Sequence, residues 1–453
     1  MTQRTIIINE NFVTPFGVKP GEVEIIDGKI ISIADTIQPQ KNDLIFDARH
    51  RYILPGLIET HGHFREPGLE QKEDIEHGTR AALAGRFTTV FDIPNTKPPI
   101  TTVALLKEQI SRYQKKSYCD FAINFGSSVE HVSELEIVDP RDITGVKVFT
   151  AGHQTTPTTI PKLSDQAKIW EVAARRGFPI LVHAENQNLV SSREAAYKSQ
   201  GHNTLIDYSK ARSELVVEMA AWEAVILAKY YKTKLWILHA STKGEFDAVA
   251  YARKNGITAS GEIAGYQLFF TTDDYKKYGA KIKVSPALRS PRVNRELWDM
   301  VRNGTIDGLC SEHTPHLLSE KEGDIWTAAS GTPGIQETVA AFITGWTKIF
   351  GKESVEECLV RLVQMSCQNV ANFFGYVKKS GIVVGNYADL VMLDIEHDWT
   401  VKKEDLFTKL QWSAYEGMRL NGRPIATWLR GNLVYQDGKI IGTHSGQWLR
   451  KGK

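Results

Sequence analysis

Eight short apolar segments recur along the chain, and each has the length and composition of a buried β-strand. Segments with helical spacing lie between them, as in residues 73–85, 164–176, 213–231 and 245–255. Strand and helix alternating in this way are typical of a (β/α)8 barrel, an α/β fold with a closed inner sheet of parallel strands. The expected strands are residues 53–63, 88–95, 119–125, 144–149, 179–185, 235–241, 257–263 and 306–313.

The two ends of the chain carry a different pattern. In residues 1–54, Asp27-Gly28 lies between β-branched runs, which is a strong hairpin signal, and Asp437-Gly438 repeats it near the other end. Neither end is long enough to form a comfortable core alone. We therefore predict that residues 1–54 and 376–453 form one small β-sandwich domain, with the barrel of residues 55–375 inserted between them.

Composition excludes several classes of partner. The chain has 453 residues, and 55 Lys and Arg nearly balance 53 Asp and Glu without a clustered basic stretch, so nucleic acid is not expected to bind. A run of about 18 apolar residues and the long apolar region of a signal peptide are both missing, which argues against a membrane partner. The four cysteines form no CxxC pair, which suits a reducing compartment. These features predict a cytoplasmic protein.

Histidine, lysine and glutamate residues stand at or just after the ends of several predicted strands. Barrel enzymes collect their chemistry at the C-terminal ends of the strands. His61 and His63 are two residues apart, so the period of a strand places both imidazoles on one face, where one metal ion could take both. The residues at such positions are His61, His63, Lys147, His183, His239 and Glu312.

These residues lie within sequence motifs that identify a family. The chain resembles the amidohydrolase superfamily, and within it the cyclic amidases that include dihydroorotase, allantoinase and hydantoinase. His-Phe-Arg-Glu-Pro-Gly at 63–68, followed by Pro-Asn-Thr at 94–96, is most similar to dihydroorotase. Further matching motifs are Gly145-Val-Lys-Val-Phe149, Val182-His-Ala-Glu185, Leu238-His-Ala-Ser241 and Glu312-His-Thr-Pro-His316.

The resemblance implies a centre of two divalent metals, most readily zinc, that share a hydroxide. His61 and His63 are expected to hold the first ion, His183 and His239 the second, and Lys147 to bridge them as a carbamate. An ordinary ammonium group beside two cations would be repelled, whereas carboxylation turns the lysine into an anionic ligand.

Glu312 departs from the family pattern. The family has an aspartate here, which ligates metal and carries a proton to the leaving nitrogen. One extra methylene moves the carboxylate by about one C–C bond, and a misplacement of about 1 Å can cost ~10²-fold in rate. Two interpretations stay open: Glu312 still serves as ligand and catalytic acid–base, or the site binds metal and catalyses poorly.

The residues expected to recognise substrate give a mixed pattern. The resemblance implies that Arg65 pairs with a substrate carboxylate, that Asn95 assists it and that His316 makes a further contact. Ser285 stands where dihydroorotases usually carry asparagine, and Gly265-Tyr-Gln-Leu268 replaces a usual Pro-His-His-Leu. Such polar contacts can decide between related rings.

The leading prediction is a zinc-dependent dihydroorotase, which interconverts dihydroorotate and N-carbamoyl-aspartate in pyrimidine biosynthesis. An allantoinase or hydantoinase, acting on rings without the carboxylate, is the first alternative, because Ser285 fits it as well or better. The second alternative is a catalytically weak dihydroorotase-like scaffold subunit. The resemblance also implies a homodimer or homotetramer.

Overall fold

The computed structural model describes residues 3–152, 156 and 158–452. It contains the predicted barrel, with its strands in two hydrogen-bonded groups ordered β6-β7-β8 and β9-β10-β11-β12-β13-β14. A parallel bridge from Gly62 to His313 joins the first strand to the segment after the last. The strands are β6 (Leu57–Gly62), β7 (Phe87–Asp92), β8 (Asp120–Ile123), β9 (Phe125–Gly126), β10 (Val146–Phe149), β11 (Ile180–His183), β12 (Leu235–Ile237), β13 (Ala259–Ala264) and β14 (Gly308–Cys310).

Two predicted strands differ from the observed ones. The run 53–63 splits at Gly56, so that its first part pairs in the small domain and only β6 enters the barrel. The run 119–125 breaks at Asn124 into β8, which pairs with β7, and β9, which pairs with β10. The side-chain amide of Asn124 donates to the carbonyl of Asp92 at 3.0 Å and so satisfies a polar group at this break.

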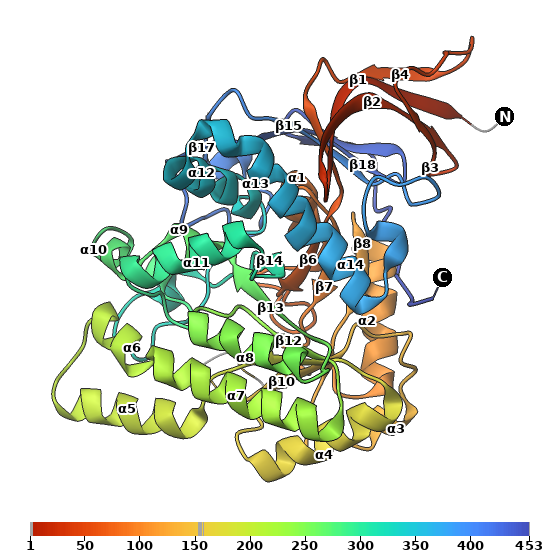
Figure 1. The fold of residues 1–453 in the computed structure, drawn as a ribbon. Helices are drawn as coiled ribbons and strands as arrows, with labels where there is room; N and C mark the ends of the chain where they lie inside the picture. Colours follow the sequence, from red (N-terminus) through yellow and green to blue (C-terminus); the bar gives the residue numbers. More distant parts are fainter. Residues whose placement is uncertain (1–2, 153–155, 157, 453) are drawn as a thin grey trace.

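Helices surround the barrel (Figure 1). The four predicted helical segments correspond to α1, α4, α7 and α8. Apolar side chains of the helices and of the strands' outer faces form one large buried cluster. The helices are α1 (Ile75–Ala84), α2 (Val103–Lys116), α3 (Glu134–Ile137), α4 (Leu163–Arg176), α5 (Gln187–Ser199), α6 (Leu205–Ala211), α7 (Glu214–Tyr231), α8 (Lys243–Lys254), α9 (Gly265–Phe269), α10 (Tyr275–Tyr278), α11 (Pro291–Asn303), α12 (Thr338–Phe350), α13 (Val355–Val363) and α14 (Asn369–Phe374).

Strands from both ends of the chain share a nine-stranded sheet, seen as red and blue ribbons together in Figure 1. Both predicted hairpins are present: Asp27-Gly28 joins β2 to β3, and Asp437-Gly438 joins β19 to β20. The division at residues 54 and 375 stays a prediction. The strands are β1 (Arg4–Thr14), β2 (Gly17–Ile26), β3 (Lys29–Ala34), β4 (Leu44–Asp47), β5 (Tyr52–Pro55), β15 (Leu390–Asp394), β18 (Arg423–Leu429), β19 (Asn432–Gln436) and β20 (Lys439–Ile440).

Candidate active site

The six expected metal ligands meet at the C-terminal ends of the barrel strands. His61 lies in β6 and His63 just after it, Lys147 lies in β10, and His183 is the last residue of β11. His239 and Glu312 follow β12 and β14. All six side chains are buried. Because the parallel strands all end on the same side of the barrel, residues that are far apart in the sequence lie close together there.

Short distances connect the histidines. His183 Nδ1 lies 3.0 Å from His239 Nε2, and the rings of His61 and His239 are 4.9 Å apart between centroids. Ligand atoms of His61, His239 and Glu312 all lie within 4.8 Å of one another. This spacing allows one cation to be contacted by several of these groups.

Three of the histidines have one ring nitrogen held by a neighbouring oxygen. His61 Nδ1 lies 3.2 Å from Glu262, His63 Nδ1 lies 2.6 Å from Asn95, and His183 Nε2 lies 3.1 Å from Glu185. If that nitrogen donates its proton to the oxygen, the other nitrogen is left as a free acceptor. Metal-binding histidines are oriented in this manner.

The imidazoles are suited to bind metal because they are held neutral. Burial is the main reason that the pKa of His61, His63 and His239 falls well below the ordinary value. Burial also lowers the pKa of His183, against the opposing effect of Glu185. A neutral imidazole offers a lone pair to a metal ion, whereas a protonated one does not.

Glu262 is a buried carboxylate whose role sequence reasoning missed. It accepts hydrogen bonds from Thr60 at 2.5 Å and from the indole of Trp236 at 2.8 Å, besides facing His61. Its position inside the strand β13 carried a signal, since a glutamate in an otherwise buried strand requires partners. Glu262 fixes the orientation of His61.

The amine of Lys147 is buried and has no hydrogen-bond partner among the residues that the structure describes. It lies 4.5 Å from the ring centroid of Phe149. Burial lowers the pKa of Lys147 to about 7. An isolated ammonium ion in such a place is costly, so the position favours a lysine that is neutral or chemically converted to an anion.

The carboxylate of Glu312 divides its two oxygens between different neighbours. Oε2 accepts a hydrogen bond from the hydroxyl of Tyr266, and Oε1 lies 4.0 Å from His239 Nε2. Burial raises the pKa of Glu312 to about 8, although Tyr266 and Lys147 oppose the rise. A carboxyl group of this kind can accept and release a proton near neutral pH.

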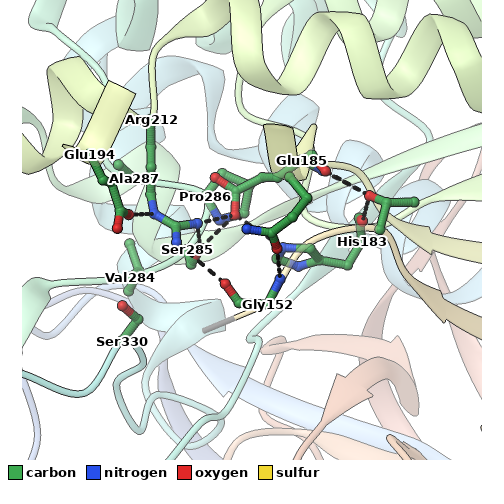
Figure 2. Close-up of polar contacts among 12 residues, drawn as sticks. Gly152, His183, Glu185, Glu194, Arg212, Val284, Ser285, Pro286, Ala287 and Ser330 are labelled. Atoms are coloured by element: carbon green, nitrogen blue, oxygen red, sulfur yellow. Dashed lines mark hydrogen bonds and ion pairs between the residues drawn. The ribbon is translucent and has the colours of Figure 1, made fainter. Parts of the chain in front are cut away.

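Glu185, which follows β11, forms the centre of a buried polar network (Figure 2). Arg212 donates to it at 2.6 Å and Ser285 donates to it at 2.7 Å, while Arg212 also reaches Glu194 at 3.0 Å. Although burial alone would raise it, the pKa of Glu185 is held well below its ordinary value by the Arg212 guanidinium. The hydroxyl of Ser285, predicted to touch substrate, is therefore engaged with this network.

Arg65 and His316 lie together. Arg65 Nη2 is 3.2 Å from His316 Nε2, and Arg65 Nε donates to the carbonyl of Pro315 at 3.3 Å. The remaining nitrogen, Nη1, is buried without a hydrogen-bond partner in the described ranges. Lys72 lies 3.4 Å from the other ring nitrogen of His316 and forms an ion pair with Glu320 at 2.6 Å.

A cavity of about 490 Å³ lies beside these groups. Asn95, Lys72 and Glu320 are among its lining residues. Small-molecule sites occupy cavities of this size, with a few polar groups placed to orient the ligand. The cavity thus gives a small substrate room next to the strand ends.

Three site residues adopt the left-handed backbone conformation that favours glycine. The φ angles are 64° at Arg65, 37° at His239 and 46° at Glu312. Such conformations cost about 1–3 kcal/mol each and persist where the surroundings enforce them. These three residues follow β6, β12 and β14, where the chain directs side chains into the site.

The donor set fits a metal centre. Four neutral imidazoles converge with a carboxylate, and both the Lys147 amine and His239 Nδ1 are buried without a partner in the described part of the chain. Imidazole and carboxylate ligands suit zinc and neighbouring divalent metals.

Comparison with known proteins identifies the family. The model of the Amidohydrolase family matches residues 52–434. The chain belongs to the amidohydrolase family. It is 29% identical over 448 residues to an allantoinase of Desulfitobacterium hafniense, covering 98% of each chain. It is 31% identical over 456 residues to a dihydroorotase of Pyrococcus horikoshii, covering 100% of this chain and 97% of the relative.

Solved structures give the same group. An L-hydantoinase (dihydropyrimidinase) from Arthrobacter aurescens superposes with a TM-score of 0.94 at 26% identity, covering 100% of both chains. This amidohydrolase is therefore a member of the cyclic amidohydrolase group, a hydrolase acting on cyclic amides, with the predicted barrel and β domain. Within the described ranges, no helix is both long and apolar enough to cross a membrane.

Proposed function

We propose that the protein is a dihydroorotase, which opens dihydroorotate to N-carbamoyl-aspartate and closes it again in pyrimidine biosynthesis. The observation that carries this choice is Arg65. Its guanidinium is buried beside His316 and keeps Nη1 without a partner among the described residues. A buried guanidinium with an unused donor is suited to bind a carboxylate, which dihydroorotate carries and hydantoin lacks.

The proposed metal centre uses the residues that meet at the strand ends. His61 and His63 would hold one zinc ion, His183 and His239 a second, and a carboxylated Lys147 with Glu312 would complete the set. When bound, such ions lower the pKa of water and polarise the amide carbonyl. The pKa of Lys147, about 7, supports carboxylation, because the neutral amine is the form that adds CO₂ and releases a proton.

Glu312 moves the proton in this proposal. It takes a proton from the attacking water and delivers it to the ring nitrogen as the C–N bond breaks. In ring closure the same carboxyl group acts in reverse.

An allantoinase- or hydantoinase-type hydrolase is the second candidate. Ser285 supports it, because this residue replaces the asparagine usual in dihydroorotases and its hydroxyl is engaged with Glu185 and Arg212. The high TM-score to an L-hydantoinase supports it as well. A dihydroorotase-like scaffold is the third candidate.

Side-by-side hydrolysis of dihydroorotate, allantoin and hydantoin by the zinc-loaded protein tests these candidates. We expect turnover of dihydroorotate, and a rise in its KM of at least about 10-fold in Arg65→Met, because the carboxylate loses a charged partner. Arg112→Met, at a surface ion pair with Glu108, is the matched control. Preference for a ring without a carboxylate would replace the dihydroorotase assignment. If the protein retains no zinc after incubation with the metal and opens none of the rings, the scaffold would be favoured.

We also propose that identical subunits associate through α7. Leu215, Met219, Ile226 and Tyr230 are exposed by 43–78% and, with the partly exposed Trp222, recur at helical spacing along one face. A two-fold axis near Trp222 would pair two such helices in antiparallel fashion. The acidic start of one helix, with Glu214 and Glu218, would then face the basic end of the other, with Lys229 and Lys232. The protein would then be a homodimer, or a homotetramer built from two such dimers, and would work in the cytoplasm.

A further inference from the structure

Two departures from the family's sequence pattern meet in the structure. Tyr266 belongs to the segment that replaces the usual Pro-His-His-Leu, and Glu312 replaces the usual aspartate. The Tyr266 hydroxyl donates a hydrogen bond to Glu312 Oε2. We propose that Tyr266 is a positioning residue, which holds the longer carboxylate of Glu312 in the place where a shorter aspartate would serve. This inference rests on the proposed function, since it assigns Glu312 to the reacting centre.

The hydrogen bond from Tyr266 occupies Oε2 of Glu312, so that the other oxygen, Oε1, faces the histidines of the site. Glu312 Oε1 lies 4.0 Å from His239 Nε2, and ligand atoms of Glu312, His61 and His239 share a space within 4.8 Å. With Oε2 taken by the phenol, the carboxylate cannot rotate freely about its last torsion. The tyrosine therefore selects which oxygen faces the histidines and the proton path.

Tyr266 is itself held firmly. Its side chain is 3% exposed and belongs to a buried cluster with Phe270 and Tyr415. The preceding Gly265 brings α9 close to α12, because a Cβ added there would lie 2.7 Å from Thr338 Cγ2. Because packing on both sides fixes Tyr266, its hydroxyl can hold Glu312 in one position, whereas a solvent-exposed tyrosine could not do so.

The physical need for such a contact follows from the extra methylene of glutamate. It adds one rotatable bond and about 1.5 Å of reach, and a positional error of about 1 Å can cost ~10²-fold in rate. A rigid phenol removes much of that freedom by one hydrogen bond to a charged acceptor. The two departures are thus a matched pair, in which the tyrosine compensates for the longer acid.

A double-mutant cycle tests the pairing. Tyr266→Phe keeps the ring and removes only the hydroxyl, so we expect kcat to fall about 10- to 100-fold with KM changed less than about 3-fold. In Glu312→Asp, the shorter side chain no longer reaches the phenol, so Tyr266→Phe should change kcat less than about 3-fold there. Tyr376→Phe is the matched control, since its buried hydroxyl has no partner among the described residues.

A second readout does not depend on turnover. With Co²⁺ in place of zinc, Tyr266→Phe should alter the visible absorption spectrum when residue 312 is glutamate and leave it unchanged when residue 312 is aspartate. Equal effects of Tyr266→Phe in both backgrounds, or an effect no larger than that of Tyr376→Phe, would overturn the inference. If the wild type opens none of the rings, the proposed function fails, while the cobalt spectra still decide whether Tyr266 sets Glu312.

Discussion

Removing Arg212 should destabilise the protein through the charge it leaves behind. Arg212 Nη1 lies 2.6 Å from Glu185 Oε2, and Glu185 is fully buried. In Arg212→Met the carboxylate keeps, among the residues that the structure describes, Ser285 at 2.7 Å and His183 at 3.1 Å. Breaking a buried ion pair from one side costs about 3–5 kcal/mol, and we expect a loss of that order in the free energy of unfolding.

Urea unfolding followed by circular dichroism measures this loss, with metals removed from every sample. Arg175→Met is the control, because Arg175 is 52% exposed in its ion pairs and should cost at most about 1 kcal/mol. The double variant Arg212→Met with Glu185→Met removes both charges, so its loss in the free energy of unfolding should be smaller than that of Arg212→Met alone. The reasoning is refuted if Arg212→Met costs no more than Arg175→Met, or if the double variant is less stable than the single one.

Three further predictions concern other parts of the molecule. Glu10 in β1 is 1% exposed, and burial raises its pKa to about 10. The folded state therefore binds the proton of Glu10 more tightly than the unfolded state, and the free energy of unfolding should fall as pH rises from about 4.5 toward 10. Compared with the wild type, Glu10→Gln should raise the urea midpoint at pH 9 and leave it nearly unchanged at pH 5. Chelation should abolish ring opening, and zinc should restore it faster with bicarbonate present, because Lys147 needs CO₂; equal recovery rates would argue against the carbamate. Met219→Lys with Ile226→Lys should yield monomers in light scattering, whereas Ile137→Lys, at a site 67% exposed in α3, should not.

Apolar runs predicted the barrel well because a strand buried on both faces has a composition that no turn or exposed helix shares. The same signal could not show that the run 53–63 serves two sheets, since β5 and β6 are both almost entirely buried and only Gly56 separates them, while their partner strands differ. Whether a segment forms a strand depends mainly on its own residues, whereas the strand with which it pairs depends on distant parts of the chain.

The metal-facing residues were predictable because histidine and lysine are conspicuous at the ends of apolar strands. The groups that orient them were harder to find. Glu262 acts on His61, and Arg212 on Glu185, across long stretches of sequence that only the folded barrel brings together. The positive φ angles at His239 and Glu312 also could not be predicted, because residues other than glycine adopt that conformation uncommonly and no local pattern marks where they do.

The nine-stranded sheet has a consequence for how the chain is made. β5 pairs with β15, in a register that sets Pro55 against Leu390, so a strand that leaves the ribosome early finds its neighbour only when synthesis is nearly complete. Until then, the open edge of β5 and the apolar side chains of β1 are exposed to other newly made chains. Nascent protein should therefore depend on chaperones until the last strands arrive, and chains cut short after the barrel should aggregate although every catalytic residue is present.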